Sequence, residues 1–587
     1  MKYTLHENLS GLHGTVSNLH GFMHRRLDTG FDTKWCGFWV PPKKFLDYYG
    51  VRVNGIWLNG ETLEATEYGD GLVFHHETGS LSITEHVKFP EGLPGFRLEI
   101  HIENNSDDVK AVQVGVELAV DIRDKGQDIG PEGYEIDGGS GRFTVSKDDS
   151  RLTVSSDEEF SRAGEEYMKT HYPGEEQRCF VPGNLVFRRE VEGLESDTVS
   201  IDFSTSDGSF GSIDSVDQEL QHDLGRVFGS SIDSMENLIY DRNGKGVIAG
   251  HPWFQSYWAR DSFWTLMGLI DAGYFQLSQE ILENFAEEDV PGKIKLEDGG
   301  EDTDRCDTAP LFIVAADKLR RHYKISEKIE NAMEDAMSRL ELENGIVQHS
   351  AEGTWMDTLE RKPAVEIQSL WVEAAEIRED EREEELRKGL EEFTDSGRIL
   401  DSTDGDAETV NTAIPLMFGQ LDETAEEQLS RINGEFTSRY GARTRALSDP
   451  GYETGGYHTG STWPLATSWA AAANFRHGNG RHGRNLLEKT AQLLDRDQPG
   501  ALPELVNSES GELLGCPEQA WSAGMFVHVV DTYLLGIKVH EDHIRIDPVG
   551  DVNAERRGKR VRGEKLDLKF EDGDVTVMND PDLDLRI

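Results

Sequence analysis

The chain has 587 residues, of which 36% are hydrophobic and 9% aromatic, and its formal net charge is −52. A chain of this length is too long to fold around one compact hydrophobic core, so the length predicts two to four domains. No run of about 18 apolar residues occurs, so no membrane span is expected. The negative field repels nucleic acid and anionic membrane surfaces, which excludes both as expected partners.

The 111 Asp and Glu residues are spread along the whole chain, whereas a disordered acidic tail would be confined to one end. Self-repulsion of this size destabilises a compact chain unless salt screens it, and molar salt shortens the Debye length to about 3 Å. The even acidic excess therefore predicts a protein of a salt-filled cytoplasm, as in halophiles. Most of the carboxylates are expected to be solvated surface groups.

The four cysteines are far apart and form no CxxC pair; they are Cys36, Cys179, Cys306 and Cys516. This spacing predicts a reduced chain without a structural metal site. The histidines do not follow HExxH spacing, and no glycine-rich phosphate loop occurs, so neither a metal nor another cofactor is expected. The first residues, "MKYTLHENLSGLHG", lack the basic and apolar regions of a secretory signal, which predicts a cytoplasmic location.

Residues 1–214 carry short runs in which hydrophobic and polar residues alternate, such as "VRVNGIWLNG", "FRLEIHIENNS" and "VQVGVELAVDIR". Glycine, asparagine and aspartate separate these runs. Alternation of period two with β-branched and aromatic residues is typical of strands that bury one face. We therefore predict an N-terminal antiparallel β-sandwich domain over residues 1–214.

The periodicity becomes helical near residue 215, from "QHDLGRVFGSSIDSMENLIYD" onward. Roughly twelve helical segments follow, up to "FVHVVDTYLLGI". Six helical hairpins are what an (α/α)6 barrel requires, and we predict this barrel over residues 215–536. Strand-like alternation then returns in "KVHEDHIRIDPVG" and "EKLDLKFEDGDVTVMN", which predicts a small C-terminal β appendage over residues 537–587. Its basic stretch, residues 553–566, is expected to be a surface hairpin.

Aromatic and charged residues gather in the loops between the predicted helices. Sugar rings stack on aromatic side chains while carboxylate and guanidinium groups bind their hydroxyls, so this mixture indicates a carbohydrate site. The candidates are Trp258, Arg260, Asp261, Asp307, Trp355, Asp357, Glu366, Tyr457, His458, Trp463, Glu504 and Gln519. Plainer interpretations exist: aromatic residues at helical spacing are usually core, Asp307 suits a helix N-cap, and His458 suits a structural histidine.

The stretches "WARDSFW", "CDTAPLF", "TWMD…AVEIQSLW", "YHTGSTWP" and "LPEL…GCPEQAWS" occur in the order seen in the glucosidase domain of glycogen debranching enzymes, which the chain resembles. The stretch "NLHGFMHRRLDTGFDTKWCGFWVPPKKFLDY" is similar to the β-domain that precedes it in archaeal and bacterial members. Two departures bear on substrate preference more than on reaction class: Thr459 stands where the family commonly has Asn, and Pro310 follows Asp307.

The resemblance implies hydrolysis of an α-glucosidic bond, typically the α-1,6 branch stub of glycogen, with inversion at the anomeric carbon. An inverting glycosidase uses one carboxyl as general acid and a second as general base, roughly 6.5–9.5 Å apart. In the family pattern Asp307 matches the acid and Glu504 the base. Asp261, Asp357 and Glu518 are alternatives. The expected substrate-binding residues are Trp258, Arg260, Asp261, Trp355, Asp357, Glu366, Tyr457, His458, Trp463 and Gln519.

Other functions fit the same residues. A glucoamylase-like or trehalase-like exo-glucosidase, or a hydrolase of a compatible-solute glucoside, would use the same barrel, because specificity lies in the loops. A phosphorylase would place phosphate where the base-activated water stands. A glucan-binding scaffold needs no opposed carboxylates, and a purely structural barrel gives the Trp-rich loops no role.

Overall fold

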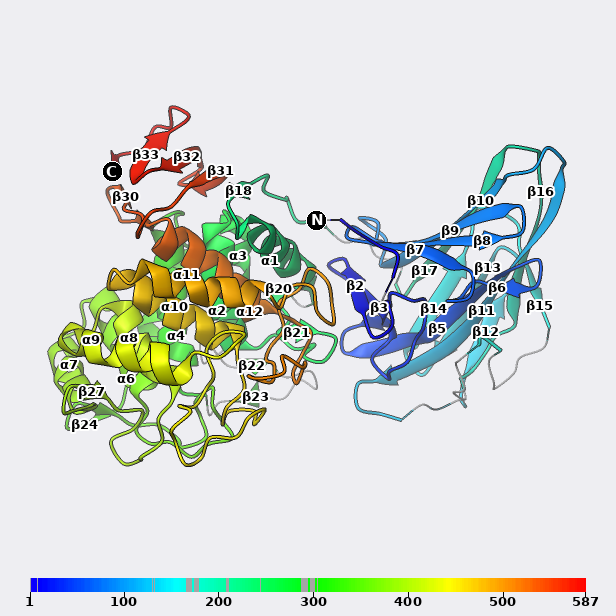
Figure 1. The fold of residues 1–587 in the computed structure, drawn as a ribbon. Coiled ribbons are helices and arrows are strands. Elements are labelled where there is room, and N and C mark those ends of the chain that lie inside the picture. Colours follow the sequence, from blue (N-terminus) through cyan, green and yellow to red (C-terminus); the bar gives the residue numbers. More distant parts are fainter. Residues whose placement is uncertain are drawn as a thin grey trace. The chain divides into compact units, whose positions relative to one another are not determined.

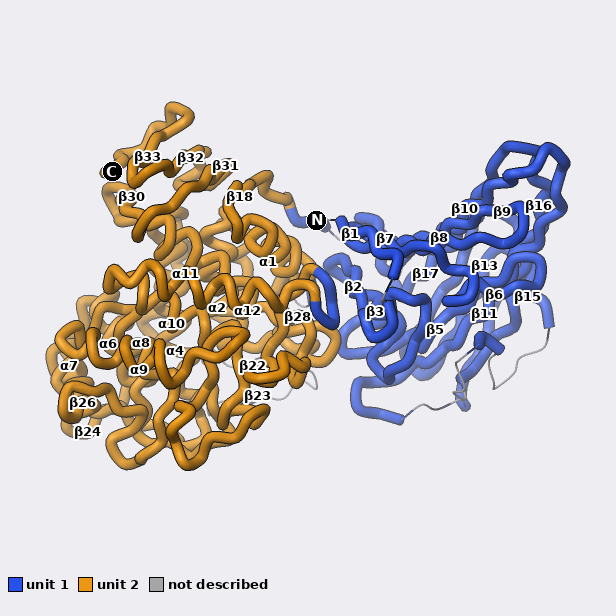
Figure 2. Tube along the Cα trace, viewed as in Figure 1, with its two compact units in different colours: residues 1–213, 240–242, 496–499 blue, residues 214–239, 243–495, 500–587 orange. Residues whose placement is uncertain are grey.

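The computed structural model describes the chain except residues 1, 8, 129, 131, 165–170, 174–178, 207–210, 243, 287–293, 296–300 and 303–304. Part of the acidic, glycine-rich loop before Asp307 therefore lies outside the described residues. The chain divides into two compact units, residues 1–213, 240–242 and 496–499, and residues 214–239, 243–495 and 500–587 (Figure 2). Among the described residues, no helix is long and apolar enough to cross a membrane.

The first unit consists of two antiparallel sheets (Figure 1). Their strand orders are β1-β7-β8-β9-β10-β17-β14-β13-β12 and β15-β16-β11-β5-β4-β3-β2, with β6 beside β5. The strands are β1 (Tyr3–Leu5), β2 (His13–Ser17), β3 (Phe22–Arg26), β4 (Gly37–Val40), β5 (Lys43–Val53), β6 (Ile56–Trp57), β7 (Leu63–Tyr68), β8 (Leu72–Thr78), β9 (Leu81–Lys88), β10 (Gly95–Asn104), β11 (Lys110–Asp124), β12 (Glu135–Gly138), β13 (Arg142–Lys147), β14 (Ser150–Ser155), β15 (Ser161–Ala163), β16 (Asn184–Val191) and β17 (Ser196–Ser204). Buried side chains of both sheets form one hydrophobic cluster. The predicted N-terminal antiparallel β architecture is thus confirmed.

Strand β9 illustrates why these sequences form half-buried strands. Its residues alternate between buried and partly exposed along the whole strand, as the period-two pattern predicts. The polar residue on the buried face, Glu85, accepts hydrogen bonds from Arg25 Nη1 and from the Tyr49 hydroxyl, both at 2.7 Å. The buried charge is therefore paired, which is the condition for keeping it in the core.

The second unit contains twelve α-helices within its described residues. They are α1 (Gly225–Asn237), α2 (Ala259–Asp271), α3 (Phe275–Phe285), α4 (Thr308–Arg320), α5 (Glu327–Met337), α6 (Val365–Arg378), α7 (Glu383–Glu391), α8 (Ala413–Phe418), α9 (Ala425–Arg431), α10 (Pro464–Arg476), α11 (Gly480–Ala491) and α12 (Ala520–His528), with shorter helical turns η1 (Val410–Thr412), η2 (Asp422–Thr424), η3 (Ile432–Phe436) and η4 (Val529–Leu534). Its strands are β18 (Glu219–Gln221), β19 (Ile239–Asp241), β20 (Lys245–Val247), β21 (Gly250–His251), β22 (Ile294–Lys295), β23 (Glu301–Asp302), β24 (Leu342–Glu343), β25 (Ile346–Val347), β26 (Thr394–Asp395), β27 (Arg398–Ile399), β28 (Glu518–Gln519), β29 (Ile537–Val539), β30 (Ile544–Ile546), β31 (Ala554–Val561), β32 (Glu564–Glu571), β33 (Asp574–Val577) and β34 (Leu585–Arg586), although most of β19 falls in the first unit.

The even-numbered helices form a closed ring in which each contacts the next, α2-α4-α6-α8-α10-α12-α2. Helices α1, α3, α5, α7 and α11 each pack against a member of this ring. Burial distinguishes the inner helices from the outer ones. Every residue of the inner helix α2 is buried, whereas the outer helix α7 buries only Leu386, Gly389 and Leu390. Six inner helices with an outer layer make up the (α/α)6 arrangement that the helical periodicity predicts.

The strands after the helices are divided between two sheets, and one of these also includes a strand that precedes the helices. Strands β31, β32 and β33 pair in sequence, but β18, which precedes α1, pairs with β31 at the edge, and β29, β30 and β34 form a separate sheet.

The basic stretch 553–566 forms most of the β31–β32 hairpin, and two of its cations are fully buried. Arg556 donates to both oxygens of Asp531 (2.9 and 3.0 Å). Lys559 Nζ lies 3.0 Å from Asp531 and 3.1 Å from Asp271. The expectation of a surface hairpin is wrong at these positions, because their charges anchor the hairpin to the helices.

We expect Lys559→Met to destabilise the second unit by about 3–5 kcal/mol, because it removes one partner of a buried ion-pair cluster. Lys569→Met in the same hairpin is the matched control, since this lysine pairs with Glu571 at the surface. The control should leave the free energy of unfolding nearly unchanged, because water and salt screen this exposed pair. Urea denaturation in molar KCl measures both, and equal transition midpoints would contradict the anchoring role of Lys559.

Candidate active site

The predicted residues gather where the inner helices begin. Arg260 and Asp261 lie in the first turn of α2, and Asp307 directly precedes α4. Trp463 directly precedes α10, and Gln519 directly precedes α12. Side-chain contacts between these helix starts show that they share one end of the ring.

Glu504 is buried, and two chain segments hold its carboxylate. The Cys516 N–H donates to Oε2 (2.9 Å), and the Tyr457 hydroxyl donates to Oε1. The Glu504 N–H in turn donates to the Cys516 carbonyl (2.8 Å). Burial raises the pKa of Glu504 to about 6; the two hydrogen bonds to the carboxylate oppose this rise, and the charge of Asp357 adds to it. Glu504 is therefore a fixed carboxylate that exchanges its proton close to neutral pH.

Gly515 leaves room for the Glu504 carboxylate. A Cβ at this position would lie 2.5 Å from Glu504 Oε2 and 2.9 Å from Glu504 Cβ. We expect Gly515→Ala to lower kcat by about 100-fold, because a displacement of about 1 Å has that effect on a positioned catalytic group. Gly229→Ala in α1, where an added Cβ meets nothing within 4 Å, is the control and should leave kcat unchanged. Equal kcat values in the two variants would contradict a role for Glu504 in the chemistry.

Asp307, the predicted general acid, is bound by a guanidinium group. Arg260 donates to both oxygens, through Nε to Oδ2 and through Nη2 to Oδ1 (3.1 Å), and both side chains are buried. Asp307 occupies the N-cap position of α4, as the plainer interpretation expects, but its side chain makes no capping hydrogen bond to the helix. Arg260 Nη2 also lies 3.4 Å from the Gly353 carbonyl, which further fixes the guanidinium. Asp307 thus holds Arg260 in place through charge-assisted hydrogen bonds.

Asp261 connects α2 to the start of α12. Gln519 Nε2 donates to Asp261 Oδ1 (2.9 Å), and Gln519 Oε1 is buried without a hydrogen-bond partner. Burial raises the pKa of Asp261 to about 7; the Arg260 charge opposes this rise, and the Glu504 charge adds to it. Buried polar atoms are nearly always hydrogen-bonded, so the Gln519 oxygen lacks the partner that such an atom usually has.

Among the acidic residues of the candidate site, Asp357 is the one whose side chain reaches solvent. Its side chain is 37% exposed, and Arg305 Nη1 donates to one of its oxygens, Oδ2 (3.1 Å). Burial raises the pKa of Tyr457 as it does that of Glu504, and the charge of Asp357 adds to both shifts. Asp357 therefore lies within electrostatic range of Glu504 while remaining open to a substrate.

An aromatic cluster lies beside these acids. Tyr457 and His458 have ring centroids 4.6 Å apart, Tyr457 and Trp463 are 5.0 Å apart, and Trp355 and Trp463 are 5.3 Å apart. Burial lowers the pKa of His458 to about 3, and its Nδ1 lies 2.7 Å from Thr358 Oγ1, so the ring is neutral and fixed. Tyr457 is 40% exposed, so solvent meets the cluster at the ring whose hydroxyl binds Glu504.

Two predicted residues have other surroundings. Glu366, at the start of α6, accepts from Arg361, which also donates to Asp401 (2.9 Å); the three form a buried ion-pair cluster. Trp258 is half-buried at the N-cap position of α2.

Sequence reasoning missed Arg305, although it stands two residues before Asp307 in "DRCDTAP", and the proximity of that motif was the available signal.

A cavity of about 250 Å³ lies elsewhere in the second unit. Asp271 and Met267 of α2 line it, and none of the predicted site residues does. Asp261 and Asp271 are ten residues apart on the same helix, which corresponds to about 15 Å. The cavity therefore belongs to the opposite end of α2 and is separate from the carboxylate group.

Two family models match the second unit. A model described as amylo-alpha-1,6-glucosidase matches residues 230–403. A model described as the mannosylglycerate hydrolase MGH1-like glycoside hydrolase domain matches residues 366–522. Each spans less than half of the chain. The comparison with curated proteins gave no match.

Solved structures share the fold. A putative kojibiose phosphorylase from the human microbiome has a TM-score of 0.62 and 8% identity, over 99% of this chain and 98% of that one. A bacterial glucoamylase complexed with acarbose has a TM-score of 0.57 and 12% identity, over 89% of this chain and 93% of that one. At these identities the likeness concerns the fold alone, and it supports the prediction of a β domain followed by an (α/α)6-type helical domain.

Both family models describe glycoside hydrolase domains, and the segments that they match carry Arg260, Asp357 and Glu504. The chain is a glycosidase, as the sequence predicts.

Proposed function

We propose that the chain is an inverting α-glucosidase that releases glucose from α-1,6 branch stubs of a glycogen-like polymer. The observation that carries this proposal is the Glu504 carboxylate, which is buried, fixed by two donors and close to the charge of the exposed Asp357. Such a pair suits an inverting glycosidase, which needs a base for the attacking water and an acid for the leaving oxygen. The amylo-alpha-1,6-glucosidase match over residues 230–403 supports the choice of bond.

Glu504 acts as the general base. In its deprotonated form it takes a proton from a water molecule as that water attacks the anomeric carbon. The Tyr457 and Cys516 donors each occupy one site on a carboxylate oxygen, and each oxygen keeps a further lone pair for the water. In a phosphorylase, phosphate would replace this water, so a fixed base favours hydrolysis.

Asp357 donates the proton to the leaving oxygen, in place of Asp307, to which the sequence pattern assigns the role. Both oxygens of Asp307 accept from Arg260, so protonating Asp307 would break a buried bidentate ion pair. Asp357 has a contact to Arg305 on one oxygen, and its side chain reaches solvent. Asp307 is then a positioning residue for Arg260.

The remaining residues bind the glucose unit at the reacting bond. Arg260 and Asp261 offer a cation and a carboxyl group to its hydroxyls, and Gln519 Oε1 offers an acceptor. The aromatic cluster around Tyr457 and Trp463 presents the apolar surface on which a sugar ring packs. This division explains why the loops combine aromatic and charged side chains.

Glucose release in about 2–3 M KCl tests the proposal, at a salt level that screens the self-repulsion of so acidic a chain. Phosphorylase limit dextrin, maltooligosaccharides and trehalose are compared, with and without phosphate. Glucose from limit dextrin alone, without phosphate, is the expected result. Release mainly from linear chains or from trehalose would mean that the activity is glucoamylase-like or trehalase-like. A requirement for phosphate would mean that the enzyme is a phosphorylase and not a hydrolase. No release by the folded protein would leave a glucan-binding scaffold.

We expect kcat/KM to fall as the pH drops through about 6, because burial raises the pKa of Glu504 to that value and the base must be deprotonated. The Glu504 charge also raises the pKa of Asp261, so the acidic limb of the pH profile, where kcat/KM falls, reports the ionisation of these two coupled groups together. Tyr457→Phe removes a hydrogen bond that lowers the pKa of Glu504, so the limb should move to higher pH. Tyr533→Phe, whose hydroxyl donates to the Met417 carbonyl, is the control and should not move it. An unmoved limb in Tyr457→Phe would rule out Glu504 as the titrating base.

A further inference from the structure

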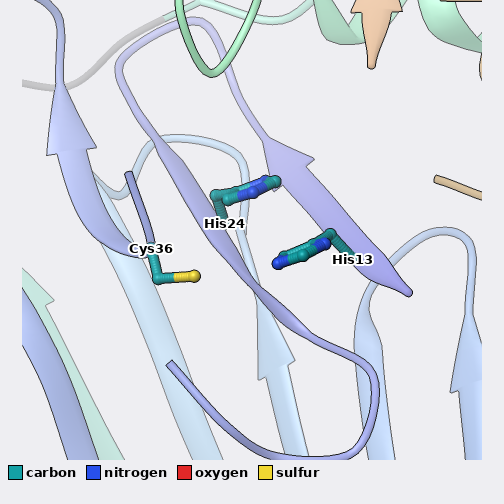
Figure 3. Close-up of side chains that lie close together, drawn as sticks. All are labelled: His13, His24 and Cys36. Carbon is teal, nitrogen blue, oxygen red and sulfur yellow. The ribbon is translucent and has the colours of Figure 1, made fainter. Parts of the chain in front are cut away.

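A second group of reactive side chains lies in the first unit. Strand pairing aligns Thr15 of β2 with His24 of β3, and His24 with Gly37 of β4. This register brings together His13, His24 and Cys36, which comes directly before β4 (Figure 3). One potential ligand atom from each of the three residues lies within 4.8 Å of the other two.

The hydrogen bonds of His24 define which ring nitrogen can bind a metal. The Thr15 hydroxyl donates to Gln498 Oε1 (3.1 Å) and lies 2.8 Å from His24 Nδ1. A hydroxyl has one proton, so Thr15 can only accept from His24, and Nδ1 must carry the ring proton. The lone pair of the neutral ring is therefore on Nε2. Ligating histidines usually donate their other nitrogen in this way, which fixes the ring.

Asp32 adds a fourth donor atom to the group, a carboxylate oxygen. Its Oδ1 lies 3.1 Å from His13 Nε2 and 3.9 Å from Cys36 Sγ. Zinc–nitrogen and zinc–sulfur bonds of about 2.0–2.3 Å at tetrahedral angles separate the donor atoms by about 3.3–3.8 Å. Both distances are close to that range. Cys36 and His24 are buried, whereas Asp32 is 39% exposed, which gives an ion a route from solvent.

We propose that His13, His24, Cys36 and Asp32 form a binding site for one divalent zinc-type ion. A thiolate, two imidazoles and one carboxylate make a mixed donor set that suits tetrahedral zinc and not magnesium or calcium, which prefer oxygen ligands. Four protein ligands leave no open position, so the ion is structural and joins β2, β3 and the segment before β4. The donor atoms of His13, His24 and Cys36 lie within 4.8 Å of one another, so the ion would draw them to the tetrahedral spacing by side-chain movements that include rotation of the two parallel imidazole rings, whose centroids are 5.1 Å apart.

The metal content of the purified full chain tests this site. The chain is produced with added zinc, exchanged into metal-free buffer containing molar KCl, and analysed by mass spectrometry for elements. We expect one zinc ion per chain, lost in Cys36→Ser and in His13→Gln. Cys179→Ser is the matched control, because Cys179 is also buried in the first unit but contacts Asp47. It should keep the ion.

Cobalt substitution gives a second readout that does not depend on the variants' stability. Co²⁺ in the unmutated chain should show the intense visible bands of a tetrahedral site and a thiolate charge-transfer band in the near ultraviolet. Asp32→Asn, a change at the partly exposed ligand, should weaken cobalt binding at least about 10-fold while the chain stays folded. Zinc content near zero in the unmutated chain, or equal in Cys36→Ser and Cys179→Ser, would overturn the proposal. So would cobalt spectra of an octahedral ion.

Discussion

Glu504→Gln is expected to lower kcat for glucose release by between about 100-fold and 10,000-fold, which is the contribution of a positioned general base. The change keeps the size of the side chain, replaces one carboxylate oxygen with an amide NH2 and removes the ability to take a proton from water. Because the amide oxygen can accept from the Cys516 N–H while the amide NH2 donates to the Tyr457 hydroxyl oxygen, the site should keep its shape, and KM should change little. Steady-state kinetics on limit dextrin measure the effect, with circular dichroism to show that the variant is folded.

Glu509→Gln is the matched control for this loss. Glu509 is exposed and lies five residues further along the same segment, so its replacement should leave kcat unchanged. In Glu504→Ala, azide should restore turnover by attacking the anomeric carbon directly, while the leaving oxygen takes its proton from the acid. The expected product is β-glucosyl azide. A Glu504→Gln variant with kcat within about 10-fold of the unmutated chain would exclude Glu504 as the base.

Asp357→Asn is expected to lower kcat on α-1,6-linked glucan by between about 100-fold and 10,000-fold and to have little effect on α-glucosyl fluoride. The reason is the leaving group: an alkoxide needs a proton from the acid as the bond breaks, whereas fluoride leaves without one. Glu504 still activates the water in this variant, so the fluoride is hydrolysed at close to the original rate. The ratio of the two rates therefore isolates the step in which the acid acts.

Asp307→Asn provides the comparison. It weakens the bidentate pair with Arg260, and we expect it to lower the rates on both substrates by similar factors, because Arg260 then binds the sugar less well. The opposite pattern, with fluoride hydrolysis preserved in Asp307→Asn and lost in Asp357→Asn, would return the general acid to Asp307. The two variants thus decide between the sequence pattern and the contacts in the folded chain.

The architecture could be predicted from the sequence because it depends on periodicity. Alternation of period two marks strands such as β9, and a largely apolar run such as "FWTLMGLI" in α2 marks a helix of the inner ring. The buried hairpin cations Arg556 and Lys559 could not be predicted in this way, because their partners Asp531 and Asp271 belong to distant helices. A basic stretch in an acidic chain has the same pattern whether its charges face solvent or a buried carboxylate.

The site residues could be predicted as a group but not in their individual contacts. The loop motifs carry the right residue types, and the helix starts bring Arg260, Asp307 and Gln519 to one end of the ring. Which carboxylate is occupied by a guanidinium depends on side-chain geometry that spacing does not encode. The same limit applies to Cys36: the absence of a CxxC pair predicted no metal site, whereas strand register places two histidines beside this cysteine.

The configuration of the first glucose released tests the central claim most directly. Proton NMR distinguishes the two anomers in the first minutes, before mutarotation mixes them. A water activated by Glu504 attacks the face opposite the leaving oxygen, so an α-linked substrate should give β-glucose in a single displacement. Initial accumulation of β-glucose from limit dextrin is the expected result. Initial α-glucose would mean two displacements through a covalent intermediate, and it would contradict Glu504 as a base for water.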